Sequence, residues 1–260
     1  QDITTNTFIA KGRMTRGVIV AKEAGIIAGL PLVSAIFSYL DPNMTIVSLK
    51  KDGAIVNKGD IILRFSGKAR AILSGERVAL NFVQHLSGVA TATAQLVTAL
   101  RGTKTRLLDT RKTLPGLRFL EKYAVQMGGG FNHRLNLTDM VLIKDNHLVL
   151  SADTLEREIA LIRKKHPKHL IEIEAHSPAA VHTFAALDVD MIMLDNMSPQ
   201  EIKKFVGYIR KMAPRILIEA SGNISIRTAR TIAQTGVDFI SVGKITHSPN
   251  ALDLSLQLHA

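Results

Sequence analysis

The feature that most constrains the fold is a series of short apolar segments that recur from residue 106 to residue 243. Six segments follow one another at about 23 residues per unit, and amphipathic stretches separate them. This spacing is typical of βα units, which form parallel sheets. Each segment ends in polar residues or glycine, at the strand ends where such folds build their sites. The predicted strands are 106–109, 140–144, 170–174, 191–195, 216–221 and 239–243.

The length of this repeat region restricts the choice of parallel fold. A full barrel of eight units needs about 250 residues, and the six units span far fewer. An incomplete, open α/β barrel and a doubly wound sheet are both compatible with that length. A doubly wound sheet would gather its polar residues at one switch point. Because they recur at every strand end here, we expect the incomplete barrel.

The first part of the chain has a different pattern. Strand-like segments and turns surround one helical stretch near 31–40, which predicts an α+β module. Apolar residues at helical spacing between 75 and 100 then predict a long connecting helix. We expect a domain boundary near residue 88.

Composition excludes several classes of protein. The chain has no cysteine, which removes disulfides, cysteine zinc sites and thiolate nucleophiles. Its apolar runs fall short of the roughly 20 residues that a membrane-spanning helix needs, so no membrane association is expected. The net charge of +11 could serve nucleic-acid binding. Aromatic residues make up only 5% of the chain and tryptophan is absent, however, which leaves few surfaces for base stacking.

Positive charge gathers in loops that follow the first two predicted barrel strands. Arginine offers a planar donor fork for carboxylate or phosphate, and lysine offers a point charge. A pocket for a small, multiply anionic ligand explains this pattern at least as well as a nucleic-acid duplex does. The alternative is that several of these residues are surface charges and that the glycine run 128–130 is a flexible turn. The candidate residues are Arg111, Lys112, His133, Arg134 and Lys144.

Two carboxylates end consecutive predicted strands. Glu174 and Asp195 are 21 residues apart, and neighbouring strands lie about 4.8 Å from each other. They could share a Mg²⁺ ion, which prefers one or two carboxylates together with substrate phosphates. Ion pairs with neighbouring lysine and arginine are an equally good explanation of the spacing. His176 fits no metal-binding spacing, and we do not expect it to be a ligand.

The last two strand ends carry small residues before helix starts. In α/β barrels a phosphate commonly lies between these loops at a helix N-terminus, where glycine lets backbone N–H groups approach closely. Ordinary βα turns are the alternative. The candidate phosphate-binding residues are Ser221, Gly222, Asn223 and Gly243.

Taken together, these motifs resemble the quinolinate phosphoribosyltransferase family. Ten ordered segments carry the resemblance almost from end to end, and their order is more specific than any one of them. Among them are ERVALN at 76–81, LSGVATAT at 86–93, DTRKT at 109–113, GGGFNHR at 128–134, IKDNH at 143–147, EIE at 172–174, LDN at 194–196, EASG at 219–222 and SVG at 241–243.

The resemblance implies a fold and an assembly. The expected fold is an N-terminal α/β (α+β) sandwich over 1–88, followed by an incomplete, open α/β barrel over 89–246, with 247–260 packing back on the sandwich. The expected assembly is a homodimer, or a higher oligomer, in which each sandwich covers the partner's barrel mouth. A cytoplasmic location and no nucleic-acid partner are also expected.

The implied reaction joins quinolinate to phosphoribosyl pyrophosphate and gives nicotinate mononucleotide, pyrophosphate and CO₂ in NAD biosynthesis. By resemblance, quinolinate is bound by Arg111, His133, Arg134 and Lys144, and by Arg77 from the partner subunit. By the same resemblance, the phosphoribosyl donor is contacted by Lys112 and Lys144. Its ribose is held by Glu174 and Asp195, which also hold its pyrophosphate through Mg²⁺. Its 5′-phosphate is bound by Ser221, Gly222 and Gly243. Asn223 stands where some relatives have glycine. The alternatives are a same-fold paralogue that uses nicotinate or accompanies molybdate transport, and a basic nucleic-acid-binding protein.

Overall fold

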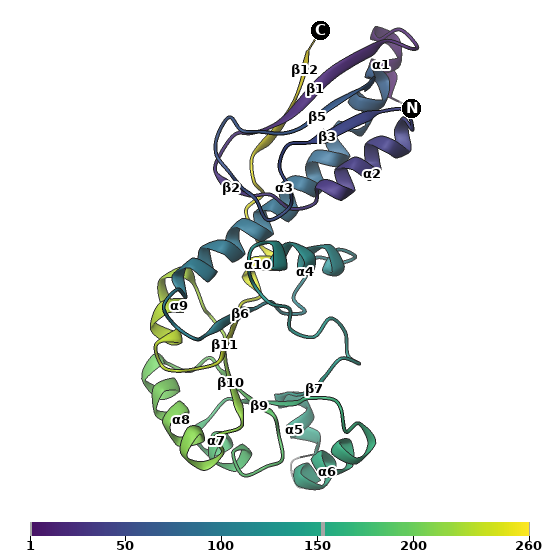
Figure 1. Cartoon of the computed structure of the whole chain (residues 1–260). Coiled ribbons are helices and arrows are strands. Elements are labelled where there is room, and N and C mark those ends of the chain that lie inside the picture. Colours follow the sequence, from purple (N-terminus) through teal and green to yellow (C-terminus); the bar gives the residue numbers. More distant parts are fainter. Residues whose placement is uncertain (1, 152–153, 260) are drawn as a thin grey trace. The chain divides into compact units, whose positions relative to one another are not determined.

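The computed structural model describes residues 2–151 and 154–259. Their contacts divide the chain into two compact units (Figure 1). The first contains Gln1–Ala94, Leu114–Gly129 and Ile245–Ala260, and the second contains Gln95–Thr113 and Gly130–Lys244. The predicted boundary at residue 88 lies inside one long helix, α3 (Ala69–Ala99). Residues 114–129, which the sequence assigns to the barrel, belong by their contacts to the first unit.

The first unit is a two-layer α/β sandwich. Its antiparallel sheet has the strand order β12-β1-β5-β3. One apolar core joins this sheet to α2 (Leu30–Leu40) and to the first half of α3, and within it the rings of Phe37 and Phe65 lie 5.5 Å apart. The C-terminal strand completes the sheet by pairing with β1. The strands are β1 (Met14–Ala21), β3 (Thr45–Ser48), β5 (Ile61–Lys68) and β12 (Leu254–His259); the smaller elements are α1 (Ile3–Phe8), β2 (Gly25–Ile26), β4 (Ile55–Val56), α4 (Arg118–Met127) and α10 (Lys244–His247).

The second unit contains a six-stranded parallel sheet in the order β6-β11-β10-β9-β8-β7. The order is sequential from β7 to β11 and then places β6 beside β11, which is the circular order of a barrel and has no switch point. Because β6 and β7 form the two edges, the barrel is open between them, as the sequence predicts. The strands are β6 (Arg106–Leu108), β7 (Val141–Ile143), β8 (Ile171–Ala175), β9 (Met191–Asp195), β10 (Leu217–Ser221) and β11 (Phe239–Ser241).

The helices of this unit begin close behind the strands they follow. Figure 1 shows α7 (Pro178–Phe184), α8 (Pro199–Met212) and α9 (Ile226–Ala233) along one side of the sheet; α5 (Asp145–Ser151) and α6 (Leu155–Lys165) follow β7. Ser177 caps α7 and Ser198 caps α8, each followed by proline, and Ser225 caps α9 in a capping box with Thr228. These caps keep the loops short. The polar residues at the strand ends are therefore held at the carboxyl edge of the sheet.

Among the described residues, no helix combines the length and apolar character needed to cross a membrane.

Candidate active site

A cavity of about 450 Å³ opens at the carboxyl ends of the barrel strands. It collects side chains from the ends of all six strands, and so brings together residues spread over more than 130 positions of sequence. Ten of the predicted site residues line it: Arg111, Lys112, His133, Arg134, Lys144, Glu174, Asp195, Ser221, Gly222 and Asn223. Gly243 is next to it, since a Cβ there would meet the side chain of Lys112. Arg77 lies on α3 in the first unit and is not among the lining residues.

One buried carboxylate fixes the segment that carries the histidine and arginine. The chain at Phe131 pairs with β6 in a parallel bridge at Leu108. Just beyond that bridge, the fully buried Asp109 accepts a hydrogen bond from the backbone N–H of His133 at 2.8 Å. This contact joins residues 24 positions apart. It places His133 and Arg134 beside the loop that carries Arg111 and Lys112.

Positive charge is concentrated at this side of the cavity. Partial burial and the nearby charge of Arg111 both lower the pKa of Arg134. Because the two positive charges repel each other, an anionic ligand between or beside these guanidinium groups is favoured. Planar donor forks suit carboxylates in particular. From the end of β7, Lys144 adds a third charge and contacts the carboxylate of Glu174 at 2.7 Å.

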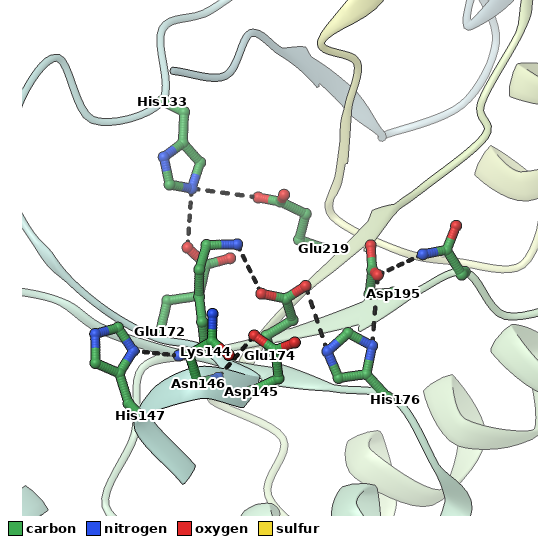
Figure 2. Close-up of polar contacts among 11 residues, drawn as sticks. His133, Lys144, Asp145, Asn146, His147, Glu172, Glu174, His176, Asp195 and Glu219 are labelled. Atoms are coloured by element: carbon green, nitrogen blue, oxygen red, sulfur yellow. Dashed lines mark hydrogen bonds and ion pairs between the residues drawn. The ribbon is translucent and has the colours of Figure 1, made fainter. Parts of the chain in front are cut away.

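Glu174 and Asp195 lie together at the ends of β8 and β9, with the ring of His176 between them (Figure 2). The ring nitrogens of His176 are 3.5 Å from the carboxylate of Glu174 and 3.4 Å from that of Asp195. One ligand atom from each residue can be chosen so that all three lie within 4.8 Å of one another. Two carboxylates and an imidazole form a donor set that fits a divalent cation. Histidine spacing does not indicate His176 as a ligand; its position two residues after Glu174, at a strand end, is the signal that the sequence offers.

The loops after β9 and β10 are fixed to each other through asparagines. Asn196 donates to the carboxylate of Asp195 and accepts from the amide of Asn223. Both asparagines have a positive φ, 55° at Asn196 and 50° at Asn223, which asparagine tolerates better than most residues. A side chain at Gly222 would collide with Asn196. The Ser221–Asn223 loop is thereby held open toward the cavity, just before the start of α9.

A second acidic group lies deeper in the barrel. Glu172 and Glu219 have no exposed surface, and both face the imidazole of His133 (Figure 2). The Nε2 atom of His133 is 2.8 Å from a carboxylate oxygen of Glu172 and 3.7 Å from one of Glu219. The Nδ1 atom accepts the backbone N–H of Arg134 at 2.8 Å. Neither glutamate is marked as a site residue by its sequence pattern, since both lie within apolar strands.

Burial dominates the ionisation of this pair. It raises the pKa of Glu172 to about 7, against the opposing effects of the contact with Glu219 and of the charges on Lys144 and Arg134. Burial and the negative charge of Glu172 raise the pKa of Glu219 to about 8, with His133 opposing the rise. A proton therefore resides in this pair at neutral pH.

Two family models together match most of the chain. The N-terminal domain of quinolinate phosphoribosyl transferase matches residues 2–87, and the C-terminal domain matches residues 89–257. A probable nicotinate-nucleotide pyrophosphorylase (carboxylating) from Synechocystis sp. is 46% identical over 92% of this chain and 81% of that protein. The corresponding protein of Mycobacterium leprae is 39% identical over 99% of this chain and 91% of its own length.

A solved structure gives the same result. The crystal structure of NadC from Streptococcus pyogenes has a TM-score of 0.93 and 41% identity, and the match covers 100% of this chain and 91% of that one. This agreement extends over both units. The chain belongs to the quinolinate phosphoribosyltransferase family.

Proposed function

We propose that this protein transfers a phosphoribosyl group from phosphoribosyl pyrophosphate to quinolinate and removes a carboxyl group, in NAD biosynthesis. The products are nicotinate mononucleotide, pyrophosphate and CO₂. The observation that carries the proposal is the meeting, in one cavity, of an arginine and lysine cluster, a pair of carboxylates and a glycine-containing loop before a helix. Relatives at 46% and 39% identity are named for this carboxylating activity.

The cationic side of the cavity suits a dicarboxylate. We assign the two carboxylates of quinolinate to Arg111, Arg134 and Lys144, with Lys112 toward the phosphoribosyl donor. His133 remains part of this assignment, but both of its ring nitrogens already have partners within the protein. For His133 to bind a carboxylate directly, one of those contacts would have to be exchanged. Its contact with the backbone of Arg134 suggests that it also positions that arginine.

The opposite side of the cavity suits phosphoribosyl pyrophosphate, the donor of the phosphoribosyl group. We propose that Glu174 and Asp195 hold the ribose and a Mg²⁺ ion, with His176 as a neighbouring nitrogen donor. When bound, the ion would neutralise the pyrophosphate that leaves. The Ser221–Asn223 loop and Gly243 would bind the 5′-phosphate through backbone N–H groups near the start of α9.

The chemistry follows from this placement. Binding both substrates in one cavity brings the ring nitrogen of quinolinate to C1′ of the ribose, so an encounter between two molecules becomes a reaction within one complex. The bond from C1′ to pyrophosphate breaks as positive charge develops on the ribose, and the nearby carboxylates stabilise that charge. The new bond leaves the pyridine ring cationic. A cationic ring can accept the electron pair that CO₂ leaves behind.

Several expectations from the sequence remain predictions. These are the homodimer or higher oligomer, the reach of Arg77 into the partner's site, the cytoplasmic location and the absence of a nucleic-acid partner. An aromatic content of 5% supports the last of them, because few bases could be stacked.

The substrate assignment predicts a clear preference for two carboxylates over one. With Mg²⁺ and phosphoribosyl pyrophosphate, purified protein is expected to form nicotinate mononucleotide from quinolinate at least about 10³-fold more efficiently than from nicotinate, because nicotinate leaves a partly buried cation unpaired. Chromatography of the products from parallel reactions measures the ratio of kcat/KM. Equal use of nicotinate, or use of nicotinate alone, would move the function to a same-fold paralogue.

A further inference from the structure

The decarboxylation leaves a carbanion on the pyridine ring that needs a proton, and the structure contains a buried acid suited to supply it. Resting on the proposed function, we propose that Glu219 is the catalytic acid that protonates ring carbon C2 after CO₂ has left. Glu219 stands on β10 and belongs to the lining of the cavity, where its side chain is packed with no accessible surface. A substrate in the cavity would lie against this part of the lining, and a rotation of the side chain toward the cavity would bring the carboxyl group of Glu219 to the ring.

The sheet directs Glu219 toward the substrate side. In the register of the barrel, Glu174 pairs with Met193 and Met193 pairs with Glu219, so the three residues stand in one row across neighbouring strands. Glu174 and Met193 line the same cavity. Ser221, two residues after Glu219 on the same face, lines it nearer the mouth. Glu219 therefore forms part of the floor beneath the assigned donor and acceptor sites.

The surroundings of Glu219 require a proton. Three groups face the carboxyl group of Glu219. They are the carboxyl group of Glu172 from β8, the imidazole of His133 from the segment before β7, and the hydroxyl of Ser241 from β11. Three of the four oxygens of Glu172 and Glu219 accept no hydrogen bond from the residues that the structure describes. Two adjacent carboxylates cannot both be ionised in a dry site without a large cost. A proton between them removes one charge and supplies the missing donor.

Hydrogen bonding locates that proton on Glu219. Because Nδ1 of His133 accepts the N–H of Arg134, the ring's own proton is assigned to Nε2. That N–H points at Glu172, at 2.8 Å, and is much farther from Glu219. Glu172 is therefore the better stabilised carboxylate.

The other candidates for this role are less suitable. Arginine does not release its proton in proteins, which excludes Arg111 and Arg134 as donors. The ammonium group of Lys144 is already engaged with the carboxylate of Glu174 at 2.7 Å. The Nε2–H group of His133 is committed to Glu172. Glu219 combines an acidic proton, a place in the cavity lining and exclusion from bulk water.

The step balances without any co-reactant. As CO₂ leaves, the electron pair of the broken C–C bond remains on C2 of the cationic ring. This pair takes the proton of Glu219, so a C2–H bond forms and the O–H bond breaks. Glu219 is left as a carboxylate beside Glu172. The repulsion between the two then favours reprotonation from water once the product has left the cavity.

The first test uses the wild-type protein. In single-turnover rapid-quench reactions with quinolinate, pyrophosphate release reports phosphoribosyl transfer, and nicotinate mononucleotide reports the protonated product. A general acid works only while it is protonated, so product formation should fall as pH rises through about 8 while pyrophosphate release falls less. If the two steps have the same alkaline profile, or neither declines, the proposal is wrong. Absence of pyrophosphate release would instead contradict the proposed function.

The second test replaces the acid. Glu219→Gln keeps the shape of the side chain but has no proton to give. We expect pyrophosphate release within about threefold of wild type, product formation lowered by about 10²-fold or more, and no remaining alkaline decline in the product step. Glu158→Gln, an exposed change on α6, is the matched control and should behave as wild type. Equal loss of both steps in a folded Glu219→Gln protein, or loss of neither, would overturn the assignment.

A conservative variant covers the case in which the glutamine protein fails to fold. Glu219→Asp retains an acid but withdraws it by one methylene. It should slow product formation selectively and keep the alkaline decline. Full activity with no decline would contradict the proposal.

Discussion

Arg134→Ala is expected to lower kcat/KM for quinolinate by about 10²–10³-fold, because a charged partner of a partly buried ion pair is lost. Arg134 shares its side of the cavity with Arg111, whose charge lowers the pKa of Arg134. Their mutual repulsion is relieved when a dicarboxylate binds. The KM for phosphoribosyl pyrophosphate should change little, since the donor is assigned to the opposite side. Steady-state kinetics with each substrate varied separately measures both effects.

Two controls separate charge from geometry at this position. Arg134→Lys keeps the positive charge but loses the planar fork, so it should recover only part of the lost activity. Arg157→Ala, on the exposed surface of α6, should have no effect. A protein with Arg134→Ala that retains wild-type kcat/KM for quinolinate would show that the dicarboxylate binds elsewhere.

Asp195→Asn is expected to lower kcat by about 10²–10³-fold, because it removes a negative charge from the place where positive charge develops on the ribose. It is also expected to raise the Mg²⁺ concentration needed for half-maximal activity, because it removes a charged ligand of the ion. This variant leaves the contact between Lys144 and Glu174 in place. Glu174→Gln should have an effect of similar size and in addition release Lys144. Activity titrated against Mg²⁺, together with Mn²⁺ binding followed by electron paramagnetic resonance, measures the two consequences.

An exposed aspartate provides the comparison. Asp188 contacts Arg163 at 3.2 Å with its side chain 75% exposed. Surface ion pairs of this kind contribute about 0–1 kcal/mol, so Asp188→Asn should leave activity and cation binding unchanged. If Asp195→Asn behaved like Asp188→Asn, the carboxylate pair would have no part in binding the donor or its cation.

Local patterns were sufficient to predict the barrel and most of its lining. Short apolar strands at regular spacing predict parallel βα units, and helices that are capped soon after each strand hold the strand-end residues at one edge. Glu174 and Asp195 were found in this way. Two features of the units are set by contacts between distant residues: the continuation of α3 across residue 88 and the contacts of residues 114–129 with the first unit. Glu121 meets His85 at 2.8 Å, and Tyr123 donates to Asp52 at 2.7 Å.

The buried acids were beyond local patterns for the same reason. In the strand IEIEA, Glu172 and Glu174 are two residues apart and therefore point to the same face of the sheet. Only Glu174 lines the cavity, however. Only the approach of His133, fixed by Asp109 24 residues earlier, shows that Glu172 has a partner. Glu219 is likewise distinguished by what faces it across the barrel. No spacing along the chain carries that information.

The most direct test of the proposed reaction is the ratio of CO₂ to pyrophosphate released by the purified protein. Quinolinate labelled at its C2 carboxyl group, with Mg²⁺ and phosphoribosyl pyrophosphate, should give one labelled CO₂ for each pyrophosphate and each nicotinate mononucleotide. Pyrophosphate without CO₂, or no turnover of quinolinate by a folded protein, would contradict the account of this cavity as a site for transfer coupled to decarboxylation.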